Sequence, residues 1–209
     1  MQGQPVESFS PAMIKAAREG ERAAQAALLR GMQDQWYRMV LRLLGDAENA
    51  REATQETALR FLKRLPGFEG RSEIRTWSLG IAINVAREMR RQKKREELTN
   101  NAPARLVGPD LQVEKREEAE LVSRVIDTLP LRQREAVVLR FFEQLSVEET
   151  ASAMGCAGGT VKALVFQALR NLRQSFGVDK KVSLRRSLGG EKEREKQKEL
   201  NDEPAQRTA

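Results

Sequence analysis

Histidine is absent from this sequence of 209 residues, and cysteine occurs once. Without histidine there can be no histidine general base and no histidine-ligated metal, and one thiol cannot form an intramolecular disulfide. The sequence also contains no glycine-rich loop of the kind that cradles phosphates. We therefore expect no cofactor, no metal site and no enzyme activity. The single thiol fits the reducing conditions of the cytoplasm.

Long apolar runs and aromatic residues are also scarce. No stretch approaches the roughly 20 apolar residues that a membrane-spanning helix needs, and the N-terminus lacks a signal-peptide pattern. Aromatic residues make up 5% of the chain, whereas charged residues make up 32%. This composition favours helices over a β-sandwich, which needs more aromatic and β-branched residues. We expect a soluble, cytoplasmic chain without membrane insertion.

Positive charge is in excess, with a formal net charge of +7 and a pI of about 9.8. Such a balance favours a polyanionic partner, although the position of the charges says more than their sum. Between Arg87 and Arg95 there are six positive charges in nine residues, against the single acid Glu88. Because like charges repel one another, this run predicts a surface that contacts phosphates rather than a solvated helix end.

Helical periodicity, together with residues that typically begin and end helices, predicts an all-α fold with two small domains joined by a flexible linker. Ser10 before Pro11 is a typical helix start, and Gly45 is a typical helix end. The segment "TNNAPARLVGP" contains two prolines and a glycine, which is typical of a linker. We divide the chain into a first helical domain, this linker, a second helical domain and a charged tail, at residues 10–98, 99–110, 111–177 and 178–209.

The second domain contains a predicted helix-turn-helix in "SVEETASAMGCAGGTVKALVFQALRNLR", residues 146–173. Ser146 can cap the first helix, Gly155 permits a left-handed turn, and Val161 can pack back on the first helix. When the residues of the second helix are placed around its axis, the predicted inner face consists of Val161, Val165, Ala168 and Leu172. The opposite face carries no acid and is expected to enter a major groove. One alternative stays open, namely that Phe166 packs on a neighbouring helix.

Three blocks in order resemble the bacterial RNA polymerase sigma factors of the sigma-70 family, in the extracytoplasmic-function group. "LRLLGDAENAREATQETALRFLKRL" resembles the core-binding segment of region 2, and "GFEGRSEIRTWSLGIAINVAREMRRQKKR" resembles the segment that melts and reads the −10 element. "IDTLPLRQREAVVLRFFEQLSVEETASAMGCAGGTVKALVFQALRNLR" resembles region 4, which reads the −35 element. The resemblance covers roughly residues 10–176. It implies three partners: core RNA polymerase, promoter DNA and an anti-sigma factor.

The resemblance also implies three sets of binding residues. The set expected to bind core polymerase is Asp46, Glu52, Gln55 and Glu56. The set expected to bind DNA at −10 is Arg75, Trp77, Asn84, Arg87, Arg90, Arg91 and Lys94. The set expected to bind DNA at −35 is Thr160, Lys162, Ala163, Phe166, Gln167 and Arg170.

The sequence departs from the family pattern at several positions. The family often has arginines at three positions of the second helix, where this chain has Leu164, Gln167 and Leu169. This difference predicts a weaker attraction to phosphates and more apolar contacts with the bases. Gly80 interrupts the fourth helix at a cost of about 1 kcal/mol. Two other functions therefore remain open at this point. One is a sigma-like adaptor or decoy that does not recognise promoters, and the other is an autonomous helix-turn-helix transcription regulator.

Overall fold

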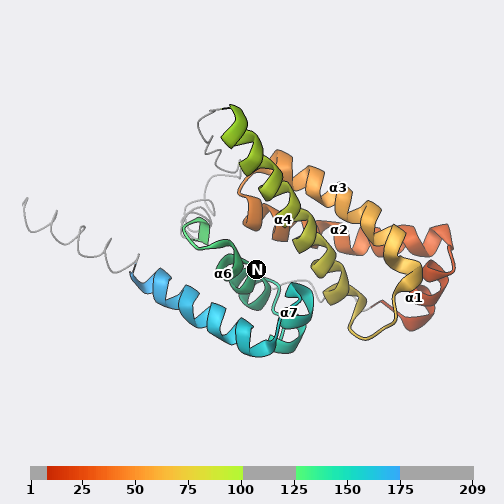
Figure 1. Ribbon diagram of the computed structural model, residues 1–209. Coiled ribbons are helices and arrows are strands. Elements are labelled where there is room, and N and C mark those ends of the chain that lie inside the picture. The colour runs from red at the N-terminus through yellow and green to blue at the C-terminus, as the bar shows by residue number, and fades with distance from the viewer. Residues whose placement is uncertain (1–8, 101–125, 175–209) are drawn as a thin grey trace, which may run out of the picture. The chain divides into compact units, whose positions relative to one another are not determined.

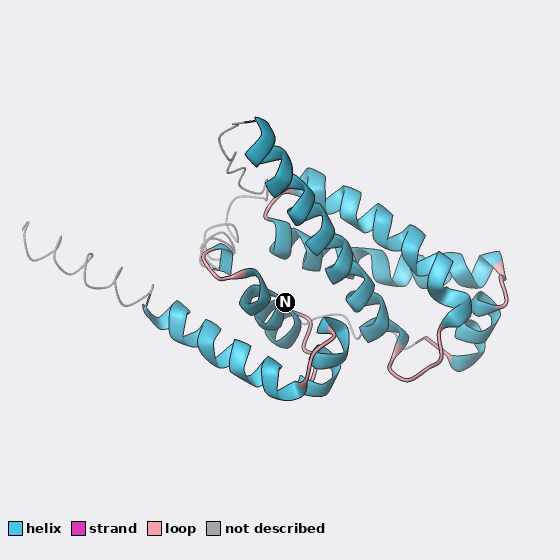
Figure 2. Cartoon of the chain, viewed as in Figure 1, coloured by secondary structure: helices cyan, strands magenta, loops and turns pink. Residues whose placement is uncertain are grey.

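The structure is a computed structural model that describes residues 9–100 and 126–174, with side chains described up to residue 96 in the first range. All regular elements in these two ranges are helical, which confirms the predicted all-α class (Figure 2). The predicted tail and most of the predicted linker lie outside the described residues. The described residues up to Ala168 belong to one compact unit.

The first range forms four α-helices and one short 3-10 turn (Figure 1). The helices α1, α2, α3 and α4 span Pro11–Arg18, Arg22–Leu44, Ala47–Arg64 and Ile74–Asn100, and the 3-10 turn spans Leu65–Gly67. In the second range, α6 spans Leu131–Val137, a π-helical turn spans Val138–Phe142 and α7 spans Val147–Met154. A last helix occupies residues 158–174.

The predicted helix boundaries follow the chemistry of the caps. The Oγ of Ser10 accepts a hydrogen bond from the Met13 backbone N–H at 3.2 Å, and Gly45 ends α2 in the left-handed region at φ 71°. Ser146 and Glu149 form a reciprocal capping box at the start of α7, and Gly155 ends that helix at φ 63°. These observations confirm all four helix signals visible in the sequence, at Ser10, Gly45, Ser146 and Gly155.

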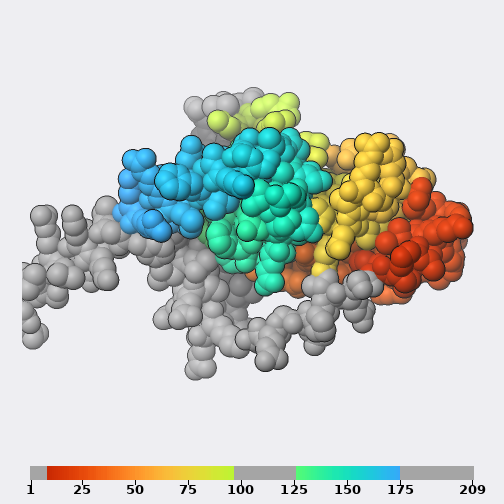
Figure 3. Space-filling model, turned by 90° about the horizontal axis from the view of Figure 1, so that it is seen from below, coloured from red at the N-terminus to blue at the C-terminus, as the bar shows by residue number. Residues whose placement is uncertain are grey.

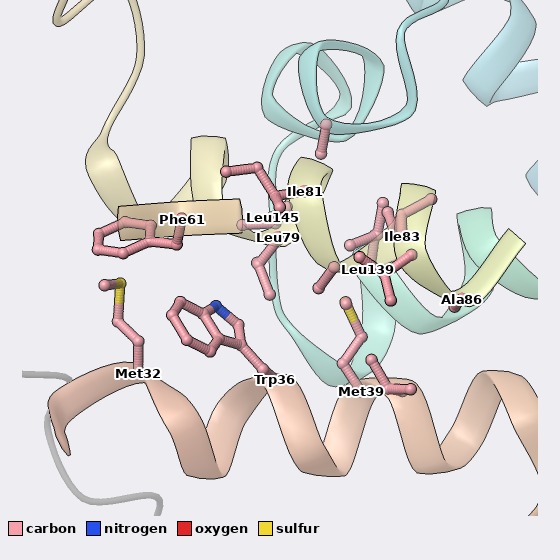
Figure 4. Packing of buried hydrophobic residues seen from close by; sticks show 14 of the residues in the cluster. Met32, Trp36, Met39, Phe61, Leu79, Ile81, Ile83, Ala86, Leu139 and Leu145 are labelled. Atoms are coloured by element: carbon pink, nitrogen blue, oxygen red, sulfur yellow. The ribbon is translucent and has the colours of Figure 1, made fainter. Parts of the chain in front are cut away.

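An apolar core runs along α2, α3 and α4 and continues into the second range. Trp36 of α2 is fully buried, lies 5.5 Å from the ring centre of Phe61 in α3, and donates a hydrogen bond to Ser78 of α4 at 2.9 Å. Figure 4 shows these aromatic residues beside Leu139 and Leu145, which come from the second range. The two predicted domains therefore share one continuous cluster of buried apolar side chains.

The helical segment that begins at Leu131 and ends at Phe142 is not regular along its whole length. It changes from α to π at Val138, and the Glu143 backbone N–H donates to the Val138 carbonyl oxygen at 3.0 Å. The wider turn, followed by Gln144 at φ 57°, lets both Leu139 and Leu145 face the core, where they are 0% and 6% exposed. Tertiary packing thus overrides the regular helical period that the sequence indicated.

Gly80 has a packing role that the sequence did not reveal. A Cβ atom at this position would lie 3.2 Å from the Ala153 carbonyl oxygen and 3.4 Å from the Ala153 Cα. The backbone of α7 therefore lies directly against α4 at this point. The cost of a glycine inside α4 is compensated by the close approach of the two helices.

Candidate nucleic-acid interface

An acidic surface lies along the outward side of α3. Glu52 and Gln55 are exposed, Glu56 is half-buried, and all three line an open pocket of about 300 Å³ between α3 and α4. The same pocket includes Leu59, an apolar side chain that is 65% exposed. An uncovered leucine within a polar rim is a common feature of protein-binding surfaces, so this pocket is suited to a protein partner.

Ion pairs fix the geometry of this pocket. The Nε of Arg60 lies 2.6 Å from Oε1 of Glu56, and its Nη1 lies 2.7 Å from Oε2 of Glu88 on α4. These two carboxylates raise the pKa of Arg60 through hydrogen bonds. Asp46 does not line the pocket. It caps α3 instead, by accepting a hydrogen bond from the Asn49 backbone N–H at 2.8 Å.

The basic run on the second half of α4 is open to solvent. Arg90, Arg91 and Lys94 are exposed, and so are Lys93 and Arg95. Among these side chains, Arg90 reaches back to the Leu43 carbonyl oxygen at 3.4 Å. The exposed run is well placed to contact a phosphate backbone, because five cations are clustered on one helix between Glu88 and Glu96.

Arg87 differs from the rest of the run because its guanidinium is paired with a carboxylate. Its Nε and Nη2 donate to the two carboxylate oxygens of Glu135 in α6, each at 2.7 Å. Its Nη1 donates to Oδ1 of Asn84 at 3.1 Å. The side chain of Glu135 is only 1% exposed. Sequence reasoning did not single out Glu135, although an acid within the apolar stretch "REAVVL" is an available signal.

The first members of the predicted −10 set are half-buried. The ring of Trp77 lies 5.0 Å from Phe68 and 5.6 Å from Phe61, so it forms part of an aromatic cluster. The Nε of Arg75 is buried and finds no hydrogen-bond partner within the described ranges. Burial lowers the pKa of Arg75, while the carboxylate of Glu143 acts in the opposite direction. The predicted −10 set is therefore divided into a covered part and an exposed part.

The predicted rotation of helix 158–174 agrees with the observed burial. Val161 and Ala168 are fully buried, and Val165 and Leu172 are partly buried. All six residues of the predicted −35 set are exposed, and Figure 3 shows that this helix (light to dark blue) is uncovered in that view. Phe166 is 69% exposed, so the alternative in which it packs on a neighbouring helix is wrong.

One contact on this surface was not anticipated. Gln133 of α6 donates to the Oε1 of Gln167 at 3.4 Å, which ties the outward face of helix 158–174 to the preceding helix. The exposed side of the helix carries Lys162 and Arg170 and no carboxylate. A face of this kind, on the second helix of a helix-turn-helix, has the shape and charge to enter a major groove.

The described ranges contain no group of side chains that would hold a metal ion. Within the same ranges, the helices are also too short or too polar to cross a membrane.

Comparison with known proteins identifies the class to which these surfaces belong. The family description "Sigma-70 region 2" matches residues 28–96, and "Sigma-70, region 4" matches residues 119–172. The ECF RNA polymerase sigma factor SigC of Mycobacterium tuberculosis is 34% identical over 164 residues, which cover 78% of this chain and 88% of that protein. The chain belongs to the sigma-70 family of RNA polymerase sigma factors, in its extracytoplasmic-function group.

Solved structures support the same fold. A structure of CnrH in complex with the cytosolic domain of CnrY has a TM-score of 0.63 at 18% identity, and covers 80% of this chain and 97% of that one. A structure of the sigma factor RpoE with the anti-sigma factor NepR, from Bartonella quintana, has a TM-score of 0.59 at 24% identity. It covers 74% of this chain and 97% of that one.

The protein is thus a promoter-recognising sigma factor that acts with core RNA polymerase in transcription initiation. The match to region 2 argues against an autonomous helix-turn-helix regulator, because such a protein does not need a polymerase-binding domain.

Proposed function

We propose that each of the three surfaces binds a different partner or promoter element during promoter recognition. The acidic face of α3, with Glu52, Gln55 and Glu56, binds core polymerase. The basic run of α4 contacts the DNA strand at −10, and the exposed face of helix 158–174 reads the −35 element. The proposal rests most on one observation: the predicted binding residues of helix 158–174 are all exposed, whereas the helix packs through its apolar side.

The composition of that exposed face suggests which bases it prefers. Gln167 can form two hydrogen bonds with adenine, and Phe166 can rest on a thymine methyl group. Lys162 and Arg170 supply contacts to phosphates or guanine. We therefore infer a −35 element that contains A·T pairs and receives fewer guanine contacts than an arginine-rich helix would make.

The function also has implications for partners and location. The two similar structures described above are complexes with CnrY and NepR, and we infer that this chain too is held inactive by an anti-sigma factor. It acts in the cytoplasm, where core polymerase and the chromosome are found. It needs no catalytic group of its own, because its task is to bind and position DNA.

Charge reversal on α3 tests the polymerase face. In Glu52→Lys the repulsion of a basic partner surface replaces attraction, so affinity for core polymerase falls by about 10-fold or more, as for other charge pairs at interfaces. Glu69→Lys is the matched control, because Glu69 is an exposed acid on the loop before α4, outside the pocket. Affinity is measured by titrating labelled protein with core polymerase. Equal loss in both variants would contradict the assignment of this face.

A further inference from the structure

The first turn of α6 contacts both helices of the helix-turn-helix. The Nη1 of Arg132 donates to the carbonyl oxygen of Met154, at the end of α7, over 3.4 Å. The neighbouring Gln133 donates from Nε2 to Oε1 of Gln167, on the outward face of helix 158–174, also over 3.4 Å. Gln133 therefore lies beside the residue that the proposed function assigns to reading adenine.

The backbone that carries Gln133 is firmly held. Its N–H donates to the Pro130 carbonyl oxygen at 2.9 Å, and the next two residues, Arg134 and Glu135, are 3% and 0% exposed. Gln167, by contrast, is exposed on the surface of its helix. A side chain on a rigid element can hold a neighbouring side chain in one geometry, which would otherwise rotate among several conformations.

The amide group of Gln167 has two ends of opposite hydrogen-bonding character. Its Oε1 can accept two hydrogen bonds, and its Nε2 can donate two. In the major groove adenine presents the N7 acceptor beside the N6 donor, so Nε2 must face N7 while Oε1 faces N6. A rotation of the amide by half a turn would bring acceptor to acceptor and donor to donor. Reading adenine therefore requires one of the two orientations of the amide.

The contact with Gln133 selects one of these orientations. Because Gln133 offers an N–H group, the oxygen of the Gln167 amide turns toward α6. This hydrogen bond uses one lone pair of Oε1, and it leaves the other lone pair and both N–H groups of Nε2 for a base. The pair of amides is thus compatible with adenine bound at Gln167 in the same geometry.

A glutamine needs such a partner more than an arginine does. The guanidinium of an arginine carries only donors, so no rotation can turn an acceptor toward the wrong atom of a base. This chain has Gln167 at a position where the family often has an arginine. The residue that fixes the orientation of the amide is therefore a feature of this chain's own pair of glutamines.

We propose that Gln133 is a positioning residue that determines base specificity at −35, because it holds Oε1 of Gln167 in the orientation that adenine requires. Gln133 acts through Gln167 and contacts no base itself. The inference rests on the proposed −35 role of helix 158–174, so the experiment below first measures whether Gln167 reads a base at all.

The experiment measures base preference with the holoenzyme formed from the full chain and core polymerase. The probe is a promoter library in which the −35 region is randomised, and sequencing of bound and unbound DNA gives the relative affinity for each base at each position. Gln167→Ala is expected to lower the preference for A·T at one position by about 5- to 150-fold, which identifies the base pair it reads. Because a preference is a ratio of affinities, it does not depend on the fraction of protein that folds.

Variants of Gln133 then measure the positioning. Gln133→Ala is expected to lower the preference at the same position by about 2- to 10-fold, because Gln167 must then be ordered on binding. In the Gln167→Ala background it is expected to have no further effect. Gln133→Lys keeps a donor and is expected to retain the preference, whereas Gln133→Glu offers only acceptors, turns the Gln167 amide round and lowers the preference as much as Gln167→Ala does. Gln33→Ala, which removes an exposed glutamine of α2, is the matched control.

The outcomes separate this inference from the function on which it rests. If Gln167→Ala changes no position, the proposed reading of a base by Gln167 is wrong, and so is the role of Gln133. If Gln167→Ala identifies a position but Gln133→Ala leaves it unchanged, changes a different position or weakens all sequences equally, only the positioning role is wrong. Equal effects of Gln133→Lys and Gln133→Glu would overturn the orientation of the amide.

Discussion

At the scale of single residues, Phe166 offers the sharpest test of the DNA-reading face. It is 69% exposed on a helix whose other side is buried, so its ring is free to contact a thymine methyl group in a major groove. Phe166→Ala is expected to reduce promoter discrimination by about 1 to 3 kcal/mol with little change in the free energy of unfolding. The measurement is promoter competition by the polymerase holoenzyme, together with urea unfolding.

A buried residue provides the matched control. Phe61 is fully buried beside Trp36 and Trp77, so Phe61→Ala is expected to cost about 3 to 5 kcal/mol of stability. If Phe166→Ala lost stability on that scale, its ring would be part of the core rather than a reader of bases.

The buried carboxyl group of Glu143 is expected to make the free energy of unfolding depend on pH. Its side chain is 7% exposed, and burial raises its pKa above the ordinary value, despite the Gln35 hydrogen bond and the nearby Arg42, Arg38 and Arg75. A raised pKa means that the folded state holds the proton more tightly than the unfolded chain. The stability that Glu143 contributes is therefore greatest below about pH 4.3 and falls as pH rises through the raised pKa.

The comparison that isolates this effect uses Glu143→Gln, which cannot ionise. Its free energy of unfolding, relative to that of the parent, is expected to rise between about pH 4 and pH 7. Urea unfolding of both proteins at several pH values gives this difference directly, because every other titrating group cancels. A difference that stays constant, or that falls with pH, would contradict the assignment.

At the scale of elements, the capping box on α7 controls the start of the helix-turn-helix. Ser146 accepts from the Glu149 backbone N–H at 3.1 Å, and Glu149 accepts from the Ser146 backbone N–H at 2.7 Å, which lowers the pKa of Glu149. Ser146→Ala is expected to cost about 1 kcal/mol of stability. Ser152→Ala, at an exposed position later in the same helix, is the control in thermal or urea unfolding. Equal effects at the two serines would exclude a capping role.

How far the elements could be predicted depends on whether their cause is local. The cap at Ser10 and the glycine ends at Gly45 and Gly155 are visible in sequence, because each acts on neighbouring residues. The π-helical turn after Val138 is not, because it arises from packing of Leu139 and Leu145 in a shared core. Local rules therefore gave the ends of helices but not this irregularity within one.

The binding surfaces, too, could be predicted only where their cause is local in the sequence. The inner and outer faces of helix 158–174 follow from its rotation, and the structure agrees with them. The contact of Arg87 with Glu135 joins residues that are 48 positions apart, and no periodic pattern predicts such a pair. The sequence therefore predicted which part of α4 is basic, but not that one of its cations is held by region 4.

At the scale of the whole molecule, the dependence of promoter binding on salt reports the two DNA surfaces together. Arg91 and Lys94 are exposed on α4, and Arg170 is exposed on helix 158–174. Each contact with a single-stranded phosphate releases about 0.7 of a counterion, and each contact with a duplex phosphate about 0.9. Removing one such contact makes the slope of log affinity against log salt concentration shallower by the corresponding amount.

The holoenzyme with Arg91→Ala is thus expected to lose about 0.7 units of slope, and the one with Arg170→Ala about 0.9. The double variant is expected to lose the sum, because the two residues lie on different elements and contact different parts of the promoter. Arg18→Ala, an exposed arginine of α1, changes the net charge equally but touches neither surface. If Arg18→Ala lowered the slope as much as the others, the general positive field of the protein would explain the binding, and the assigned contacts would be wrong.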